Sequence, residues 1–281
     1  MNSIIRKLLD YLLIIPVSII PQRFLSSQVH RLAQTETIWF KSFLLRWFCR
    51  VYKVDLSEAI KSELDGYKSF NEFFTRKLKP EARPITPGAG SIISPADGLL
   101  SQSGMIKHDL LYQAKAYYYS LRDLLTDSEL ADSFIDGQFA TIYLAPRDYH
   151  RVHMPLDGKL QRILHVPGRL WPVNPPSVRR VSSLFTRNER VILEFDTEYG
   201  KMALIMVGAL FVGSITTIFT DKLTPPYQNA IKIHDYSEKV NQGMEIGRFN
   251  LGSTVIMLLA ANAPRLNIQE AQSVQMGEKL S

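Results

Sequence analysis

Three short stretches of this sequence place reactive side chains beside turn-forming residues. They are residues 94–98 (S-P-A-D-G), 146–155 (P-R-D-Y-H-R-V-H-M-P) and 249–254 (F-N-L-G-S-T). A turn exposes a side chain that a regular strand would cover, and a glycine lets another backbone or a ligand approach closely. The candidate functional residues of the chain therefore lie in these stretches.

The peptide bond between Gly252 and Ser253 is the candidate site with the most reactive arrangement of groups. A serine hydroxyl held over the preceding carbonyl can attack it and move the acyl group from nitrogen to oxygen, and glycine leaves that carbonyl unhindered. Elimination across the resulting ester would leave dehydroalanine, which hydrolyses to a pyruvoyl group and ammonia. Gly-Ser is a common dipeptide, however, and at a strand entry it more often only forms a turn.

An attacking hydroxyl needs a base, and a histidine oriented by a carboxylate is a recurrent solution on unrelated folds. Asp97 and His153 are suitable residue types, although the sequence does not show that they meet. A histidine beside a proline turn is more often a structural hydrogen-bonding group. The pair His150 and His153 could also suggest a metal site, but a third ligand is not evident, so we predict none.

The composition limits the classes of protein to which the chain can belong. Its 281 residues, 46% of them apolar, can bury a core as one large domain or as one domain with an appendage. The single cysteine, Cys49, excludes a disulfide framework and multi-cysteine metal sites, and it fits a reducing compartment.

The net charge of +6 is concentrated in the first fifty residues. Two acidic residues, Asp10 and Glu36, stand there against a larger basic set of Arg6, Lys7, Arg23, Arg31, Lys41, Arg46 and Arg50. A basic excess within an apolar segment points to an anionic membrane surface rather than to nucleic acid.

Residues 1–76 are predicted to be a helical, membrane-associating region. The apolar run at residues 4–20 is interrupted by Asp10 and Pro16 and is shorter than a spanning helix needs, and no small-x-small cleavage site follows it. Further along, an apolar stripe at helical spacing predicts an interfacial amphipathic helix, with Phe40, Phe43, Leu44, Trp47, Phe48 and Val51. The same stripe could pack on the protein's own core, and one helix can do both with different faces.

Residues 77–281 are predicted to be a mainly β catalytic domain, which makes the whole chain α+β. Residues 77–87 are rich in proline and basic residues and are interpreted as a linker. The runs 190–197, 202–215 and 253–261 are predicted to be short strands, and residues 118–130 contain one helix centred on Leu121, Leu124 and Leu125. We find no G-x-S-x-G elbow, phosphate-binding loop, dinucleotide fingerprint or H-E-x-x-H sequence.

The three reactive stretches, together with residues 73–80 (F-F-T-R-K-L-K-P), resemble phosphatidylserine decarboxylases in the same order along most of the chain. The family's self-cleavage sequence L-G-S-T is intact at residues 251–254, and residues 207–209 and 212–215 also look like a family segment. No catalytic position departs from the family pattern. The apolar N-terminus likewise resembles that of the membrane-associated bacterial type.

This resemblance implies that Asp97, His153 and Ser253 form a self-cleavage triad that cuts between Gly252 and Ser253. Asp97 would hold the imidazole of His153, which would take the proton from Ser253. Ser253 would then become a covalent pyruvoyl group, the one cofactor expected, and would form a Schiff base with the amine of phosphatidylserine. The products would be phosphatidylethanolamine and CO2.

The resemblance assigns His150 to the decarboxylation stage, either as the acid that protonates the former α-carbon or as a group that positions the substrate. Two histidines three residues apart could exchange roles, so the division between His150 and His153 stays open. The residues that grip the lipid phosphate are also open. Arg179 and Arg180 are candidates, although an exposed basic pair is more often only solvated.

The expected mature unit is a noncovalent pair of chains, residues 1–252 and 253–281. The shorter fragment cannot bury a core of its own and must stay inserted in the sheet of the larger one. The expected partners are phosphatidylserine and an anionic membrane, on the cytoplasmic side of the cell membrane as a peripheral protein, with no nucleic acid. Whether two such units form a homodimer is left open.

Two rival functions remain open. A membrane-associated serine hydrolase could use the same serine, histidine and aspartate, but it would keep one chain with a free serine. A non-catalytic lipid-binding module would survive replacement of Ser253 without functional loss. Denaturing electrophoresis and an intact mass separate these alternatives from the self-cleaving decarboxylase.

Overall fold

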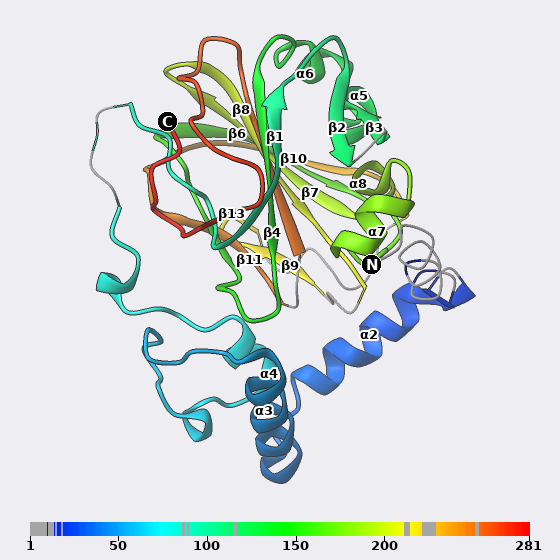
Figure 1. The fold of residues 1–281 in the computed structure, drawn as a ribbon, viewed down its shortest axis with the longest axis vertical. Coiled ribbons are helices and arrows are strands. Elements are labelled where there is room, and N and C mark those ends of the chain that lie inside the picture. Colours follow the sequence, from blue (N-terminus) through cyan, green and yellow to red (C-terminus); the bar gives the residue numbers. More distant parts are fainter. Residues whose placement is uncertain are drawn as a thin grey trace.

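The computed structural model describes residues 10, 14, 16, 17, 19–85, 88, 90–114, 117–210, 214–220, 229–250 and 253–281. Helices at the N-terminal side precede a body made of antiparallel strands, and they project from one end of that body (Figure 1). The α+β class predicted from the sequence is confirmed.

The body is built on an eight-stranded antiparallel sheet in the order β10-β6-β7-β8-β12-β4-β1-β13. In chain order, its strands are β1 (Gly98–Met105), β4 (Gln138–Leu144), β6 (Gly158–Val166), β7 (Arg190–Thr197), β8 (Gly200–Val207), β10 (Lys232–Val240), β12 (Ser253–Leu259) and β13 (Gln272–Val274). Strands distant in the sequence therefore lie side by side, and the sheet brings the three reactive stretches within reach of one another.

Strand β12 carries the candidate nucleophile, and it lies inside the sheet. It pairs with β8 on one side and with β4 on the other. Residues Val255, Ile256, Met257 and Leu258 are completely buried. A run of apolar, β-branched residues is typical of a strand covered on both faces. The segment 253–281 thus supplies an interior strand, β12, and an edge strand, β13.

Two smaller sheets complete the body. The first has the order β5-β11-β9, with β5 (Arg151–His153), β11 (Glu245–Phe249) and β9 (Ile215–Thr217), and the second pairs β2 (Leu110–Ala114) with β3 (Tyr117–Ser120). Short helices α5 (Leu121–Leu125), α6 (Ser128–Asp132), α7 (Pro175–Arg180) and α8 (Leu184–Arg187) lie along the right-hand side of the body in Figure 1. Strand β5 and the loop before it carry the two histidines of the candidate site.

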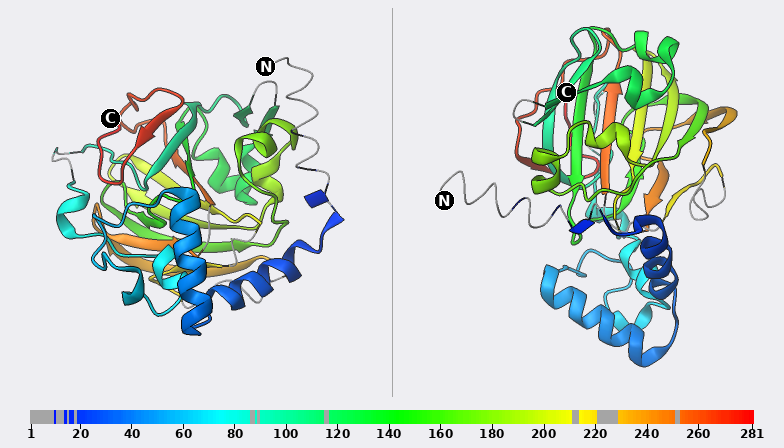
Figure 2. Two further views of the ribbon diagram at one scale, coloured as in Figure 1. Left: turned by 60° about the horizontal axis from the view of Figure 1, so that its bottom comes forward. Right: turned by 90° about the vertical axis from the view of Figure 1, so that its right-hand side faces the viewer.

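The N-terminal helices have a small core of their own. It is built from α2 (Gln22–Ala33), α3 (Ile38–Tyr52), η1 (Leu64–Gly66) and α4 (Phe70–Phe74), and η2 (Pro80–Ala82) follows before the body begins. Leu45 and Phe48 of α3 are buried against Phe70, Phe73 and Phe74. Figure 2 shows these helices beside the body in two further views. Among the described residues, none of the helices is long and apolar enough to cross a membrane.

The apolar stripe of α3 divides between two environments. Phe48 faces the small core, whereas Phe43, Trp47 and Val51 are 66%, 49% and 51% exposed. Trp39, at the start of the helix, is exposed as well. The helix therefore packs on the protein with one face and leaves a second apolar face uncovered, because successive residues of a helix point in different directions.

One sequence prediction about the body was wrong and another was incomplete. The run 202–215 is not one strand, because β8 ends at Val207 and Ile215 begins β9 in a different sheet. The helix centred on Leu121, Leu124 and Leu125 is confirmed as α5, which ends at the left-handed backbone of Thr126, but the second short helix, α6, was not expected. The runs at 190–197 and 253–261 are confirmed as β7 and β12.

Candidate active site

Ser253 is the first residue of β12 and lies opposite Leu144, the last residue of β4. Leu251 and Gly252 lie outside the described residues, and so does the side chain of Ser253. The candidate cleavage junction therefore falls at the end of an interior strand, where β4 also gives way to a loop. Residues 145–150 of that loop, which lead to the histidines, start directly beside the serine.

Asp97 lies immediately before β1, on the other side of β4. Gly98 is required here, because a Cβ atom at that position would lie 2.4 Å from the carbonyl oxygen of Tyr143. Neighbouring strands are about 4.8 Å apart, so Asp97 and Ser253, which flank β4, begin their strands roughly 10 Å from each other. A side chain between them could contact both.

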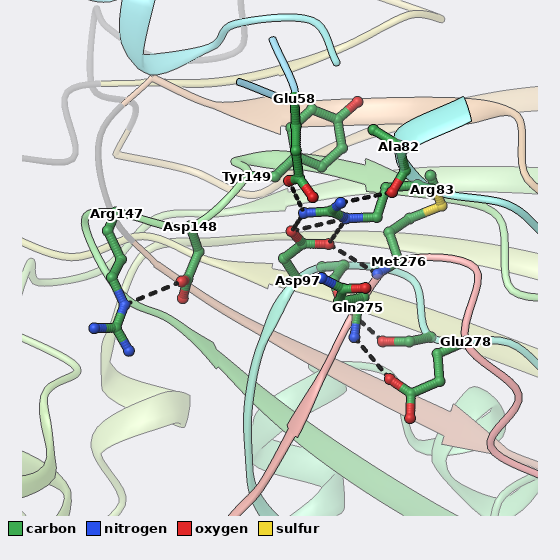
Figure 3. Close-up of polar contacts among 12 residues, drawn as sticks. Glu58, Ala82, Arg83, Asp97, Arg147, Asp148, Tyr149, Gln275, Met276 and Glu278 are labelled. Atoms are coloured by element: carbon green, nitrogen blue, oxygen red, sulfur yellow. Dashed lines mark hydrogen bonds and ion pairs between the residues drawn. The ribbon is translucent and has the colours of Figure 1, made fainter. Parts of the chain in front are cut away.

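The carboxylate of Asp97 is buried and firmly held. Arg83 donates from Nε at 2.9 Å and from Nη2 at 2.5 Å, and the backbone N–H of Met276 donates at 2.8 Å (Figure 3). Arg83 also pairs with Glu58 at 2.9 Å. A planar guanidinium matches a carboxylate in two parallel hydrogen bonds, which fixes the orientation of both groups.

His153 ends β5 and is tied to the stretch that contains Asp97, since its backbone N–H donates to the carbonyl of Pro95 at 2.8 Å. Its Nδ1 lies 2.8 Å from the carbonyl oxygen of Gly243, and its Nε2 lies 2.9 Å from the hydroxyl of Tyr149. Burial lowers the pKa of His153, partly offset by the Gly243 carbonyl. The imidazole is therefore neutral near pH 7.

The partners of His153 fix its tautomer. A carbonyl can only accept, so Nδ1 carries the hydrogen and Nε2 presents a lone pair. Burial raises the pKa of the Tyr149 phenol, so its hydroxyl stays protonated and donates to that lone pair. His153 is thus arranged as a base at Nε2, with Tyr149 occupying the position that an incoming hydroxyl would take.

The expected contact between Asp97 and His153 is not a hydrogen bond in this structure. Among the described residues, the oxygens of Asp97 accept from Arg83 and Met276, and the nitrogens of His153 contact Gly243 and Tyr149. Asp97 acts on His153 through its negative charge alone, and that charge raises the pKa of the imidazole. The two side chains share one site, but Gly243 is the group that orients the imidazole.

His150 lies in the loop that leaves β4 beside Ser253. Its Nε2 is 3.1 Å from the carbonyl oxygen of Ala145, and its ring stacks on Phe74 of α4 at 4.0 Å between centroids. The Ala145 carbonyl requires a hydrogen on Nε2, so the lone pair is on Nδ1. That Nδ1 is buried without a hydrogen-bond partner among the described residues. An orphaned buried acceptor at this position is suited to bind a proton-bearing group of a ligand.

The charge state of His150 is set by its surroundings. Burial and, next, the positive charge of Arg76 lower its pKa to about 3. His150 is therefore a neutral base near pH 7. Donation of a proton from His150 would require a negative charge beside it, such as that of an anionic substrate, to raise the pKa again.

The pKa of His150 predicts how stability depends on pH. Its pKa is about 3 in the folded chain and about 6.5 when unfolded, so between these values the unfolded chain binds more protons. The free energy of unfolding should fall as the pH drops through this window, by up to about 1.4 kcal/mol per pH unit. Urea unfolding at several pH values should show a shallower dependence for His150→Gln than for the wild type, and His108→Gln, at an exposed position, is the control. Equal slopes for all three proteins would contradict this assignment.

An apolar groove of about 480 Å³ connects the helices with this site. Leu32 of α2 and Trp47 of α3 line its outer part. Phe74, which stacks on His150, and Leu144, which pairs with Ser253, line it as well. The groove thus extends from an exposed apolar surface to the end of β12 that carries Ser253, as an aliphatic chain attached to the reacting group would require.

Arg179 and Arg180, the sequence candidates for phosphate binding, have other partners. Both pair with the carboxylate of Asp10, at 2.9 Å and 3.1 Å, and neither guanidinium is exposed. Asp10 is itself only 3% exposed. The expectation of an exposed basic pair was wrong, because the Asp10 carboxylate binds both arginines and neutralises part of their charge.

Three residues of the site were given no individual role by the sequence. Arg83 falls within residues 77–87, where proline and charge suggested a linker, yet its side chain is buried and holds Asp97. Tyr149 and Phe74 lie within the stretches that carry the resemblance, but only their contacts with His153 and His150 show what they do. A local sequence pattern does not predict such contacts, because each depends on how the fold orients the side chains.

The fold and these side chains define an α+β protein with a buried two-histidine site that faces an apolar groove. A profile of the family described as phosphatidylserine decarboxylase matches residues 70–281, and a second profile, described as PSD, matches residues 12–53.

Three curated relatives, each named phosphatidylserine decarboxylase proenzyme, are similar over most of their length. The protein of Alkalilimnicola ehrlichii is 49% identical over 85% of both chains, and that of Pseudomonas aeruginosa strain LESB58 is 45% identical over 97% of both. The protein of Nitrosococcus oceani is 42% identical over 99% of this chain and 94% of its own. The chain belongs to the phosphatidylserine decarboxylase family and is therefore an enzyme, a decarboxylase of phosphatidylethanolamine biosynthesis.

Proposed function

We propose that this chain cuts itself between Gly252 and Ser253 and then decarboxylates phosphatidylserine with a pyruvoyl group made from Ser253. The observation that carries the proposal is the buried, unpartnered Nδ1 of His150 in the loop beside the start of β12. The word proenzyme in the names of the relatives supports a processed precursor. The apolar groove beside the same loop supports a lipid substrate.

Self-cleavage needs one base and one hydroxyl. His153 offers an unprotonated Nε2, which would accept the proton of Ser253 once Tyr149 has moved aside or passed the proton on. The Ser253 oxygen then attacks the Gly252 carbonyl, and elimination leaves a carboxylate on Gly252. Hydrolysis of the remaining dehydroalanine consumes one water and releases ammonia.

The cut would leave two chains that stay together. The interior strand β12 belongs to the 253–281 fragment and is paired on both sides with strands of the 1–252 fragment. Its buried apolar side chains would be exposed to water if the fragment left. The shorter chain would therefore stay in the sheet, and the pyruvoyl group at its first residue would be held at the start of β12.

The residues of this chain would surround the pyruvoyl group with a neutral base and an apolar wall. When formed, that group supplies a carbonyl for the substrate amine and accepts electrons as CO2 leaves. His150, fixed by Ala145 and Phe74, would bind a proton at Nδ1 and deliver it to the α-carbon. Phe74 and Leu144 would exclude water from that carbon, because they line the groove at this end.

Replacement of His153 by glutamine or of Asp97 by asparagine tests the cleavage machinery. We expect each variant to remain largely uncut and to release little CO2 from phosphatidylserine, with cleavage slowed at least about 100-fold for His153→Gln, since general base catalysis contributes that much. Denaturing electrophoresis after expression and a CO2-release assay are the measurements. Asp109→Asn, which removes a carboxylate outside this site, is the control.

Rapid cleavage of His153→Gln would remove that residue from the role of base. Normal cleavage of Asp97→Asn with full CO2 release would show that the charge of Asp97 serves only to hold Arg83. The two variants therefore separate a base from a group that acts through its charge.

We also propose that the protein binds the cytoplasmic face of the cell membrane through α2 and α3. Phe24, Trp39, Phe43 and Trp47 are exposed on these helices. The basic residues of the same segment suit an anionic leaflet, and aromatic side chains suit the headgroup boundary.

The double variant Phe43→Ser and Trp47→Ser tests this attachment. Burial of each large apolar side chain is worth about 1.5–3 kcal/mol, so we expect binding to vesicles of anionic phospholipid to weaken at least about tenfold. Sedimentation with vesicles is the measurement. Ile233→Ser, at an exposed apolar position on β10, is the matched control. Unchanged sedimentation of the double variant would exclude this face as the anchor.

A further inference from the structure

A second cavity, of about 300 Å³, lies where the segment that carries α4 meets strands β5 and β11. The charged side chains that line it are Lys61, Glu72, Arg76, Lys77, Arg151 and Arg248. The cavity is therefore strongly basic. Apart from the effect of Arg76 on the pKa of His150, none of these residues was given a role in the chemistry proposed above for Ser253.

Two of the cations are neutralised by nearby carboxylates. Lys61 pairs with Glu72 at 2.6 Å, and Arg151 pairs with Glu245 at 2.5 Å. Arg151 also donates to the Thr75 carbonyl from Nε and Nη2, so all three of its guanidinium nitrogens already have partners. These two cations shape the cavity but do not make it an anion site.

The other three cations are not neutralised. Within the described part of the chain, the ion pairs around the cavity are those of Lys61 and Arg151, and no carboxylate lies within ion-pair distance of Arg76, Lys77 or Arg248. The Arg248 Nε donates to the Thr216 hydroxyl at 3.3 Å, a contact that carries no charge. Three positive charges around one cavity repel each other, and an anion between them would remove that repulsion.

Arg76 is the most informative of the three. It is 5% exposed, and its Nη2 donates to the carbonyl of Arg147 at 2.8 Å. Its Nε and Nη1 are buried without a hydrogen-bond partner in the described structure. A buried guanidinium normally has its donors satisfied and its charge paired, so two orphaned donors on a buried cation indicate a missing acceptor with negative charge.

We infer that this basic cavity is a binding site for a phosphate group, held by Arg76, Lys77 and Arg248. Arginine forks match the tetrahedral oxygens of phosphate, and a lysine adds a mobile point charge. The volume is large enough for a phosphate that carries a small polar substituent. The ligand is thus either the headgroup phosphate of an acidic phospholipid or a free phosphate ion.

The position of Arg248 favours a ligand that binds close to the active site, such as the headgroup of the substrate. This residue also lines a neighbouring polar cavity of about 540 Å³, which reaches Asn250. Arg248 lies on β11, the strand that leads to the cleavage junction. Arg76 acts electrostatically on His150. A headgroup bound here would lie beside the reactive end of β12, a refinement that rests on the proposed function.

Calorimetric titration of the full-length protein with inorganic phosphate tests the site, and it does not require the protein to be cut or active. We expect Arg248→Gln and Lys77→Gln each to weaken phosphate binding about tenfold, the loss of one charge-assisted hydrogen bond. Lys232→Gln, which removes one charge from exposed β10, should bind as the wild type does. Because Arg76→Met could disturb the loop that Arg76 holds, Arg76→Lys is used to test the guanidinium, and it should weaken binding as well.

Absence of phosphate binding by the wild type, or equal binding by wild type and Arg248→Gln, would overturn the inference. The two sources of phosphate are told apart with water-soluble, short-chain phosphatidylserine as substrate. If inorganic phosphate raises KM competitively and Arg248→Gln raises KM with normal self-cleavage, the ligand is the headgroup. If phosphate binds with no change in KM, the site is one for free phosphate. If the wild type does not cut itself, the proposed function is refuted. The phosphate titration still tests this site in that case, because it needs no cleavage.

Discussion

Replacement of Ser253 by alanine is expected to leave one uncut chain of 281 residues that releases no CO2 from phosphatidylserine. The hydroxyl of Ser253 is both the nucleophile that breaks the bond to Gly252 and the source of the ketone, so no other group can substitute for it. Denaturing electrophoresis, intact mass and a CO2-release assay give the three readouts. All three should change together.

The neighbouring Thr254 provides a matched control for Ser253. Thr254 lies on the same strand, and its buried hydroxyl has no hydrogen-bond partner among the residues that the structure describes, so Thr254→Val keeps the shape and removes only that hydroxyl. We expect Thr254→Val to cut itself and to retain activity. Normal processing of Ser253→Ala would exclude the assigned nucleophile. Loss of processing in both variants would point to disturbed folding of β12 instead.

Replacement of His150 by glutamine is expected to separate the two stages of the reaction. The glutamine amide can still donate to the Ala145 carbonyl, but the Nδ1 lone pair and the stacked ring are lost. Self-cleavage should proceed, because His153 supplies its base. Decarboxylation should fall by about 100-fold or more, the usual contribution of one general acid or base.

Single-turnover assays on the cut protein measure the second stage directly. His108→Gln, at an exposed position on the body, should match the wild type in both stages. Full decarboxylation by His150→Gln would remove this histidine from the mechanism. A block in cutting by His150→Gln, with cutting retained by His153→Gln, would show that the two histidines have the opposite roles.

A serine hydrolase with the same three residue types would behave differently in each of these tests. It would keep a single chain in the wild type, and Ser253→Ala would change its activity without changing its mass pattern. The arrangement in this structure also differs from that of a hydrolase triad, because Asp97 binds Arg83 and the His153 imidazole is oriented by Gly243. The family to which the chain belongs makes a decarboxylase the established class.

Elements with strong local patterns could be predicted from the sequence. Strand β12 follows from an unbroken apolar run, β7 follows from a run rich in valine, isoleucine and leucine, and α3 follows from apolar residues at helical spacing. The division of the run 202–215 between β8 and β9 was missed, although Gly208, Gly213 and Ser214 interrupt its apolar residues, because the two strands belong to different sheets and pair with partners distant in the sequence. The strand with which a segment pairs depends on distant residues, so a short stretch of sequence does not reveal it.

The site shows the same limit. The reactive types at positions 97, 150, 153 and 253 are visible in the sequence, and the resemblance assigns their roles. Their contacts are not visible. Arg83 in an apparent linker, the Gly243 carbonyl and the Phe74 ring each come from a distant part of the chain. Residue types are local information, whereas orientation and pKa depend on neighbours brought together by the fold.

The intact masses of the purified, active wild-type protein test the central claim most directly. Two chains are predicted, one ending with a carboxylate at Gly252 and one beginning at position 253. The second should carry a ketone in place of the N-terminal amine of a serine peptide, and it should therefore react with a carbonyl reagent. Active protein that consists only of an uncut chain, or a second chain with an intact N-terminal serine, would contradict the account.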